Sequence, residues 1–574
     1  MVLAILNINM NFMSISRRVW LVSLLVVAFS AQATDWYVAT NGVNTNPGTL
    51  AAPLDIDTAF GTINRSAPII PPVLAGDTIW LRGGTYVSKA NSATNDLRGS
   101  FTLLNNTNAS QYSIVGTSNS PIIIRNYNNE RAVLDGNLYV ATKNLWFWGL
   151  EITDSEVLPV TITRAAGDAA ISAGTYKAAN LNLYGSGNKF INCIFHDCPQ
   201  SASAKGDYNE IYGTLFIDNG RWSMDYSSGH GLYAQGSSPF SWTKVNDCVF
   251  ANNALNGCQL YSALDANINN YQMTGNLFLR NGNGVPGGVE FVEGSGSGCT
   301  NLVFKNNVML GNASDSATFG GSATLLVNAD IEQNCFYNLP VNFYSFTGLT
   351  MLSNLVDNAN SFLLVQSNYF GAVWDYNNYY FSSPTPVTMD FYPSGGAAYL
   401  THAQWVAYSG FDVHSTVAAT LTNPSVIVRS NQWEVGRGSI TIVNPRSNGV
   451  VNVDLSGIGL AKGQTYVIHP VQDFFGYCLT NTYVGTPVAI PMTNWHCYTP
   501  MSLVNAITNQ VWLTNVNGES IVNSNYSTMI PIVANGGLIS TFPAFGAFVV
   551  VPIPLVLLAP PTALIIYTNK HVNP

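Results

Sequence analysis

The sequence is poor in charge, and this limits what the protein can bind. Only 9% of its residues are charged, and 22 basic against 31 acidic residues give a net charge of -9. A nucleic-acid-binding surface needs clustered Lys and Arg, so we expect no nucleic acid as a partner. Coiled coils also need more charge than this composition offers. An acidic protein repels an acidic polysaccharide unless a cation bridges the two.

The sequence also lacks an apolar run long enough to cross a membrane near its N-terminus. The run over residues 19–29 is about half of the ~20 residues that a spanning helix needs. Arg17 and Arg18 precede it and Ala-Gln-Ala follows at residues 31–33, as in a secretory signal peptide. We predict a signal peptide over residues 1–33 and a secreted, periplasmic or cell-surface protein without a transmembrane span in the mature chain. An uncleaved membrane anchor is the alternative.

The eight cysteines lack the spacing of a metal site, because none are arranged as Cys-x-x-Cys or in a Cys/His pattern. Cys193 and Cys248 recur at one position of the repeat described below, where we expect small buried residues. Cys478 and Cys497 lie in the C-terminal region and are able to close a disulfide in an exported protein. The sequence leaves open whether they do.

A short apolar phrase recurs between residues 190 and 312, as FINCIFHDC, IYGTLFIDN, VNDCVFANN, MTGNLFLRN and FKNNVMLGN. Its second large apolar residue returns at intervals of 21 to 34 residues: Phe195, Phe216, Phe250, Phe278, Met309, Phe336 and Phe370. Another apolar residue lies five positions before each. Such variable intervals exclude a heptad and indicate coils of chain that are joined by loops of different length.

Asparagine accompanies the phrase in two columns. The first lies two residues before each anchor: Cys193, Thr214, Cys248, Asn276, Asn307, Asn334 and Asn368. The second lies three residues after it: Cys198, Asn219, Asn253, Asn281 and Asn312. Asn tolerates left-handed backbone and bonds turn amides with its side chain, so Asn in register predicts turns stacked on turns. This pattern is typical of a parallel β-helix; an antiparallel β-sandwich with accidental periodicity is the alternative.

We therefore predict an all-β protein: a right-handed single-stranded parallel β-helix followed by a C-terminal antiparallel β-sandwich. The β-helix covers residues 34–420 and begins with a cap, for which residues 57–64 offer a short helix. Alternating strands with turn signals mark the sandwich over residues 421–555. Residues 556–574 form a tail, since prolines interrupt their apolar run. We expect a monomer.

Several motifs resemble a known group of proteins. Residues 76–86, Gly-Asp-Thr-Ile-Trp-Leu-Arg-Gly-Gly-Thr-Tyr, look like the opening of secreted bacterial right-handed β-helix proteins, which include pectate-lyase-like polysaccharide lyases. Residues 210–213, 229–235 and 256–261 resemble one poorly characterised branch of that group. The resemblance implies a pectin-lyase-like fold and an extracellular polysaccharide as partner.

The interior of a β-helix is filled with side chains, so a site must lie on an outer face. In the strand after each phrase, apolar and polar residues alternate. If the apolar residues point inward, the polar residues point outward and form the floor of a groove. That floor is predicted as Tyr233, Gln259, Glu290 and Thr324. The predicted catalytic residues are His230, Arg221, Tyr233, Asp218 and Asp225. The predicted substrate-binding residues are Gln259, Glu290, Trp222, Tyr261 and Glu293.

Two reactions suit such a groove. A lyase needs a base for the proton next to a uronate carboxylate and a cation to neutralise that carboxylate, for which Ca²⁺ held by Asp or Glu would serve. A hydrolase needs two carboxylates beside the glycosidic bond. We assign His230 or Arg221 as base, Tyr233 as proton donor and Glu290 as a contact to substrate or Ca²⁺, with elimination favoured slightly. A non-catalytic surface, adhesive or glycan-binding protein is the alternative.

Some motifs favour structure over chemistry. Gly229-His230-Gly231 looks like the Gly-His-Gly motif of polygalacturonases, but Ile217-Asp218-Asn219 and Gln259-Leu260-Tyr261 replace that family's further catalytic residues. Pectin hydrolysis by that route is therefore not expected. Asp412 and His414 are interpreted as polar fixtures at the end of the last coil. Trp433, Tyr466 and Trp495 are able to stack on sugars, but aromatics in a sandwich are more often core.

Overall fold

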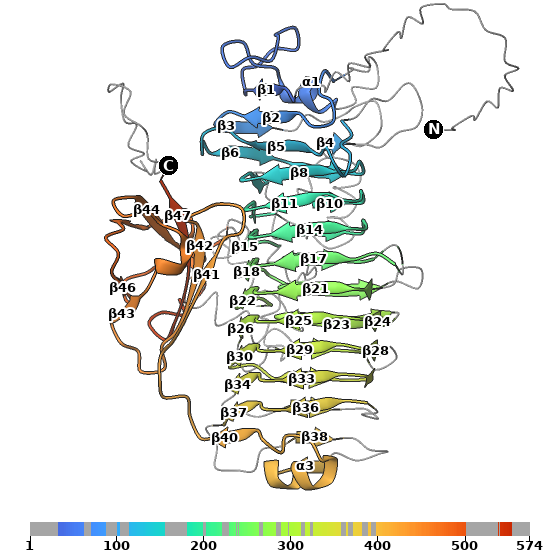
Figure 1. Ribbon diagram of the computed structural model, residues 1–574, viewed down its shortest axis with the longest axis vertical. Helices are drawn as coiled ribbons and strands as arrows, with labels where there is room; N and C mark the ends of the chain where they lie inside the picture. The colour runs from blue at the N-terminus through green and yellow to red at the C-terminus, as the bar shows by residue number, and fades with distance from the viewer. Residues whose placement is uncertain are drawn as a thin grey trace, which may run out of the picture. The chain divides into compact units, whose positions relative to one another are not determined.

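Short parallel strands stack into three large sheets, here called sheets 1, 2 and 3 (Figure 1). The structure is a computed structural model, and it describes residues 33–61, 71–87, 100–103, 114–154, 181–198, 202–220, 229–236, 238, 240–262, 268–282, 289–296, 298–311, 316–321, 325–357, 363–365, 371–381, 389–391, 398–500, 538 and 540–553. The predicted signal peptide, except for Ala33, and the predicted tail lie outside these residues.

Each coil adds one strand to sheet 1, then one to sheet 2 and one to sheet 3. Sheet 1 consists of β1 (Asp35–Val38), β2 (Thr78–Leu81), β5 (Ile122–Asn126), β8 (Leu145–Trp148), β11 (Lys189–Ile191), β14 (Asn209–Tyr212), β17 (Thr243–Asn246), β21 (Tyr271–Thr274), β25 (Val303–Lys305), β29 (Asp330–Glu332), β33 (Thr350–Leu352) and β36 (Val373–Asp375). Sheet 2 consists of β3 (Gly84–Val87), β6 (Ala132–Asp135), β9 (Glu151–Thr153), β12 (Ile194–His196), β15 (Leu215–Ile217), β18 (Val249–Ala251), β22 (Leu277–Leu279), β26 (Val308–Leu310), β30 (Cys335–Tyr337), β34 (Leu355–Asp357), β37 (Asn378–Tyr380) and β40 (Thr416–Ala418). Sheet 3 consists of β4 (Ser100–Leu103), β7 (Asn137–Val140), β10 (Leu181–Leu183), β13 (Ala202–Ala204), β16 (Leu232–Ala234), β19 (Cys258–Ser262), β23 (Phe291–Gly296), β27 (Ala317–Phe319), β31 (Val341–Phe343), β35 (Leu363–Val365), β38 (Met389–Phe391) and β39 (Ala398–Leu400).

A fourth, smaller sheet lies between sheets 3 and 1 in the chain order. It consists of β20 (Ile268–Asn269), β24 (Cys299–Thr300), β28 (Leu326–Val327) and β32 (Phe346–Thr347). The strands of successive coils pair in parallel, and only at the last described pair of sheet 3, β38 and β39, does the pairing become antiparallel. The predicted parallel β-helix is confirmed.

The predicted apolar anchors stack in one file inside the tube. The rings of Phe195 and Phe216 lie 5.1 Å apart, those of Phe216 and Phe250 5.2 Å, and those of Phe250 and Phe278 4.8 Å, all nearly parallel. Each ring is at most 2% exposed. Burial of such side chains contributes roughly 1.5–3 kcal/mol each, so this file is a main source of the stability of the tube.

The first asparagine column forms a continuous hydrogen-bonded ladder at the turn from sheet 1 to sheet 2. In one rung, Nδ2 of Asn307 donates to the carbonyl oxygen of Met273 (2.9 Å) and to Oδ1 of Asn334 (3.1 Å). Oδ1 of Asn307 in turn accepts from the backbone N–H of Asn276 (2.8 Å). The left-handed backbone lies one residue earlier, for example at Asn306 with φ 57°. The side-chain amide, not a left-handed backbone of its own, is therefore what selects Asn in this column.

Cysteine and threonine fill the early rungs of this ladder. Sγ of Cys193 lies 3.5 Å from the carbonyl oxygen of Phe147, and Oγ1 of Thr214 donates to that of Phe190 (3.3 Å). Cys193 and Cys248 are free and buried, as predicted.

The second column forms a similar ladder at the turn from sheet 2 to sheet 3. Asn219 donates to Oδ1 of Asn253, and Asn253 donates to Oδ1 of Asn281, each from both its backbone N–H and its Nδ2. The next rung is Glu290, whose two carboxylate oxygens accept from the backbone N–H (3.0 Å) and Nδ2 (2.6 Å) of Asn281. Asn312, predicted for this column, lies outside the described residues.

One predicted coil is wrong. We expected the anchor after Phe336 to be Phe370, but Phe336 pairs with Val356, which in turn pairs with Tyr379. The first ladder accordingly continues through Asn354 and Asn377. The sequence pattern missed this coil because its anchor is a valine instead of a large ring. Asn368 and Phe370 lie outside the described residues.

Both ends of the tube are closed by short helices. At the beginning, α1 (Ile56–Phe60) starts at Asp55, whose side chain accepts from the backbone N–H of Thr58 (2.9 Å), and buries Phe60 in the core. This is the cap helix predicted near residues 57–64. At the end, α3 (His402–Ser409) buries Trp405, whose Nε1 donates to Oδ2 of Asp412 (3.0 Å).

The C-terminal part consists of two antiparallel sheets that enclose a second core. The larger sheet contains β41 (Ser425–Ser430), β42 (Gly438–Val443), β47 (Phe545–Pro552), β44 (Thr465–Pro470) and β45 (Leu479–Thr482). The smaller sheet contains β43 (Val450–Val453) and β46 (Val488–Pro491), and two 3₁₀ turns, η1 (Ser456–Ile458) and η2 (Val471–Asp473), lie between the strands. Tyr466 and Trp495 are buried in this core, as preferred from the sequence. Cys478 and Cys497 are both free, so the disulfide left open by the sequence is not formed.

The larger C-terminal sheet packs on the outer face of sheet 2. Both belong to one compact unit, Thr34–Pro574. A shared apolar cluster joins outward side chains of sheet 2, such as Leu215, Val249 and Leu279, to Val549 and Phe474 of the C-terminal part. One outer face of the β-helix is therefore covered by the protein itself and is not free for a substrate.

Candidate functional site

Sheet 3 carries a row of outward side chains, and the members that the structure describes are partly exposed. Register places Tyr233 of β16 beside Gln259 of β19, as predicted for the groove floor. Both are partly exposed, while their neighbours Leu232 and Cys258 point into the core. The described members of this outward row, coil by coil, are Thr102, Tyr139, Asn182, Ser203, Tyr233, Gln259, Val292, Thr318 and Asn342.

Three rings gather in the middle of this row. The centroid of Tyr233 lies 5.5 Å from that of His230 and 5.6 Å from that of Tyr261. Nε2 of Gln235 donates to the hydroxyl of Tyr233 (3.1 Å), and Nδ2 of Asn256 donates to Oε1 of Gln259 (3.2 Å). The structure therefore brings together the predicted residues His230, Tyr233, Gln259 and Tyr261.

His230 is the most chemically distinctive member of this group. Burial lowers the pKa of His230 to about 4, so the imidazole is neutral at neutral pH. Its Nδ1 is buried and has no hydrogen-bond partner among the residues that the structure describes. Burial raises the pKa of Tyr233, which keeps its hydroxyl protonated. A neutral imidazole thus lies beside a protonated phenol, which is a base and acid combination.

Glu290 is not part of the groove floor. The strand pairing puts Val292, two residues later, beside Gln259. Glu290 is 0% exposed and serves as the last described rung of the second ladder. Thr324, the last residue predicted for the floor, lies outside the described residues.

Glu293 is also misplaced by the sequence prediction. It pairs with Leu260, which faces the core, so its side chain points into the tube. Its Oε2 accepts from the backbone N–H of Gly320 (2.7 Å), and burial raises the pKa of Glu293 to about 7. A β-bulge after Leu260 shifts the later pairing. That shift comes after Glu293, and alternation along the strand from Phe291 already turns Glu293 inward.

Asp218 lies at the turn from sheet 2 to sheet 3 and is not in contact with the ring of His230 in any described interaction. It follows β15 with left-handed backbone (φ 58°), is 3% exposed, and accepts from Nδ2 of Asn252 (3.2 Å). Burial raises the pKa of Asp218 well above its usual range. Asp218 is therefore a turn residue near the C-terminal part. Arg221, Trp222 and Asp225 lie outside the described residues.

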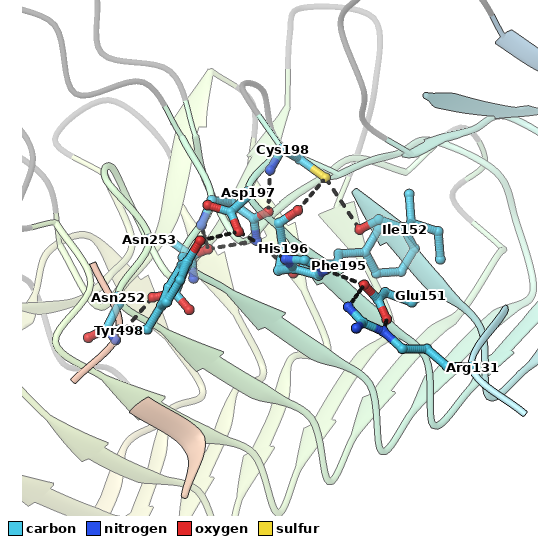
Figure 2. Close-up of polar contacts among 12 residues, drawn as sticks. Arg131, Glu151, Ile152, Phe195, His196, Asp197, Cys198, Asn252, Asn253 and Tyr498 are labelled. Atoms are coloured by element: carbon cyan, nitrogen blue, oxygen red, sulfur yellow. Dashed lines mark hydrogen bonds and ion pairs between the residues drawn. The ribbon is translucent and has the colours of Figure 1, made fainter. Parts of the chain in front are cut away.

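A charged chain of contacts near this corner was missed by the sequence prediction (Figure 2). Glu151 accepts two hydrogen bonds from Arg131 (2.6 and 2.7 Å) and lies 2.8 Å from Nε2 of His196. Nδ1 of His196 lies 3.0 Å from Asp197, which also accepts from the hydroxyl of Tyr498 (3.1 Å). The signal in the sequence is that Glu151 and His196 occupy outward positions of sheet 2, where the following coils carry apolar residues.

These contacts hold His196 protonated. Burial opposes its charge, but the hydrogen bonds to Asp197 and Glu151 outweigh burial and raise the pKa of His196 to about 9. A histidine cation whose two ring nitrogens already contact carboxylates is poorly suited to catalysis. It is well suited to a structural contact between elements. Because Tyr498 belongs to the C-terminal part, this cluster links that part to the β-helix.

Metal ligands do not gather in the parts of the chain that the structure describes, where no group of three or more His, Cys, Asp or Glu side chains is placed to hold an ion. The same residues contain no helix of the length and apolar character that a membrane span requires.

Comparison with known proteins gives a likeness of fold. No family model matches the chain, and no curated protein matches it. Among solved structures, pectate lyase Pel9A matches with 16% identity and a TM-score of 0.33 over 60% of this chain and 79% of its own. The PL6 family alginate lyase AlyGC matches with 12% identity and a TM-score of 0.31 over 63% of this chain and 52% of its own. The Dettilon tailspike protein matches with 12% identity and a TM-score of 0.29 over 73% of this chain and 78% of its own. We derive no activity from likenesses this distant.

Proposed function

We propose that this is an exported carbohydrate-active protein that binds an extracellular polysaccharide along the outer face of sheet 3 and cleaves it by β-elimination. The observation that carries the proposal is the contact between a neutral His230 and a protonated Tyr233 on that face. Neighbouring coils of a sheet are ~4.8 Å apart, so the outward row of polar side chains is a long surface that suits a polymer.

The two groups divide the proton transfers of an elimination. The neutral imidazole of His230 accepts the proton from the carbon next to the uronate carboxylate. The electron pair of that C–H bond forms the new double bond, and the bond to the glycosidic oxygen breaks. The hydroxyl of Tyr233 donates a proton to the departing oxygen. Gln259 and Tyr261 lie where they would contact the flanking sugars.

Hydrolysis is supported less well, because it needs two carboxylates beside the glycosidic bond. The predicted carboxylates that the structure describes are buried elsewhere: Asp218 in a turn, Glu290 in the ladder and Glu293 inside the tube. Nor do the described residues of this face offer a cluster of carboxylates that fits Ca²⁺, so the proposal assigns no step to a cation.

The test is a panel of acidic and neutral polysaccharides, with and without calcium, read by the ultraviolet absorbance of unsaturated uronates and by release of reducing ends. We expect an absorbance signal on an acidic polymer. The variants His230→Ala and Tyr233→Phe should each lower kcat by about 10²- to 10⁴-fold, the usual contribution of a general base or acid. Asn452→Ala, at an exposed position of β43 in the C-terminal part, is the control and should act as the wild type.

A non-catalytic glycan-binding protein is the second candidate, favoured by the placement of all three described carboxylates away from the face. It would replace the first if the protein bound a polysaccharide while both readouts stayed silent. Reducing ends without unsaturated products would contradict elimination in favour of hydrolysis. Full activity of His230→Ala would contradict the assigned base.

A further inference from the structure

Exposed aromatic residues recur at one corner of the β-helix, at the turn from sheet 3 to the next strand of sheet 1. Tyr184 follows β10, Tyr208 follows β13, and Phe240 and Trp242 follow β16. Tyr184 is 42% exposed, Tyr208 43% and Phe240 84%. An exposed aromatic ring is costly to leave in water, so its return on three successive coils points to a ligand.

Two of these rings and one lysine are in contact. The centroids of Tyr208 and Trp242 lie 5.9 Å apart in an edge-to-face arrangement, although they belong to neighbouring coils. Nζ of Lys244 lies 4.8 Å from the Trp242 ring. Lys244 makes no ion pair with any residue that the structure describes. We call Tyr184, Tyr208, Phe240, Trp242, Lys205 and Lys244 the corner strip.

The charge of this corner is opposite to that of the whole chain. We counted charges over four turns: β7 to β8, β10 to β11, β13 to β14 and β16 to β17. An outward charged residue at the start of the strand that follows a turn is included. The described residues counted in this way contain four lysines and two acids. The lysines are Lys143, Lys189, Lys205 and Lys244, and the acids are Asp207 and Glu210. Four minus two leaves +2, against -9 for the chain. Lys189 and Glu210 pair at 2.7 Å, so the net charge rests on Lys143, Lys205 and Lys244 against Asp207.

We propose that the corner strip is a second glycan-binding surface, separate from the cleavage site, and that it takes an acidic polysaccharide chain. Flat rings stack on the apolar faces of sugars, and lysines pair with their carboxylates or sulfates. The occupant is acidic because the strip combines rings with a local excess of lysine. The proposal rests on the proposed function for the class of ligand, and it adds a site that holds the polymer while another part of it lies on sheet 3.

The test measures binding of the full chain to polygalacturonate, alginate and neutral dextran by affinity electrophoresis and calorimetry. We expect retardation by at least one acidic polymer and none by dextran. Trp242→Ala should weaken binding about tenfold or more, a change of about 1.4 kcal/mol. Phe240→Ser should weaken it as well, and because Phe240 is almost fully exposed this variant cannot act through the fold. Lys244→Gln should reduce the dependence of binding on salt.

Controls separate this proposal from the proposed function. Tyr376→Ala removes a ring that is 57% exposed at the far end of sheet 1 and should bind as the wild type. His230→Ala should keep binding at the corner strip while losing cleavage, and Trp242→Ala should still cleave short oligosaccharides. Unchanged binding by both Trp242→Ala and Phe240→Ser, equal retardation by dextran, or no binding to either acidic polymer would overturn the corner strip.

Discussion

The outer faces of sheet 2 and sheet 3 differ, although the same coils build both. On sheet 2 the outward residues of the middle coils are apolar, as in Leu215, Val249 and Leu277, and the C-terminal part covers them. On sheet 3 the outward residues of the same coils are Tyr233, Gln259 and Val292, two of which are polar. The backbone of a β-helix is fixed from inside, by stacked rings and amide ladders, so its faces are free to diverge. One face has become a docking surface and another a candidate site.

The largest effect should come from placing a charge on the covered face. Leu279 is 0% exposed in the cluster that joins sheet 2 to the C-terminal part. Leu279→Asp should lower the free energy of unfolding by about 4–5 kcal/mol, because it buries a charge without a partner. Ser203→Asp, the matched change on sheet 3, should stay within about 0.5 kcal/mol of the wild type. Equal losses in chemical denaturation would show that the two faces do not differ.

The charged cluster of Figure 2 should be the next most sensitive point. His196→Leu leaves the carboxylates of Glu151 and Asp197 buried without their cation, and should cost about 3–4 kcal/mol. His414→Leu, which removes a mostly exposed histidine that also contacts a carboxylate, is the control and should cost under about 1 kcal/mol. If His196→Leu lowers the free energy of unfolding less than His414→Leu does, the charged cluster does not hold the C-terminal part to the β-helix.

The same cluster predicts a dependence of stability on pH. The pKa of His196 is raised above its ordinary value to about 9, so its contribution is complete below about pH 6.5 and is lost as the pH rises to about 9. The thermal midpoint of the wild type should fall between pH 6.5 and pH 9. In His196→Gln this fall should be smaller, and an identical fall in both proteins would exclude His196 as its cause.

The smallest change in the free energy of unfolding is expected for a substitution that separates a residue of the second ladder from a residue of the candidate site. Glu290→Gln replaces one carboxylate acceptor of Asn281 by an amide, and should cost about 1.5–3 kcal/mol, the range for hydrogen bonds to charged groups. Binding and cleavage of polysaccharide should be unchanged, since Glu290 does not reach the groove floor. Gln259→Ala should give the reverse result, with weaker binding and little change in the denaturation midpoint.

The features that sequence predicts well here are those that repeat in every coil. Phe195, Phe216 and Phe250 stack as expected, and Asn276, Asn307 and Asn334 form the expected column, because each coil meets the same neighbour in the same way. The coil anchored by Val356 escaped because a small apolar residue gives no distinctive signal. Glu293 was misplaced because the alternation was not extended along its own strand, where Phe291 and Glu293 both turn inward.

The covered face had a signal in the sequence that was not used. Strands of sheet 2 such as Leu215–Ile217 and Leu277–Leu279 are apolar at every position, which indicates burial on both faces. A half-exposed strand would alternate. The position of Asp218, and with it part of the predicted site, follows from this second burial, which depends on residues more than two hundred positions later.

Among the residues that the structure describes, the last rung of each amide ladder is an acid: Glu290 after Asn281 and Asp412 after Asn377. An asparagine side chain accepts hydrogen bonds from the preceding coil and donates a hydrogen bond to the next coil. A carboxylate only accepts hydrogen bonds. Each ladder therefore has a direction, and its donation of hydrogen bonds stops where an acid replaces the amide. The acid of the second ladder lies in the middle of the tube, and the coils continue past Glu290 as far as β40, so an unbroken row of amides at that turn is not needed for further coils to stack.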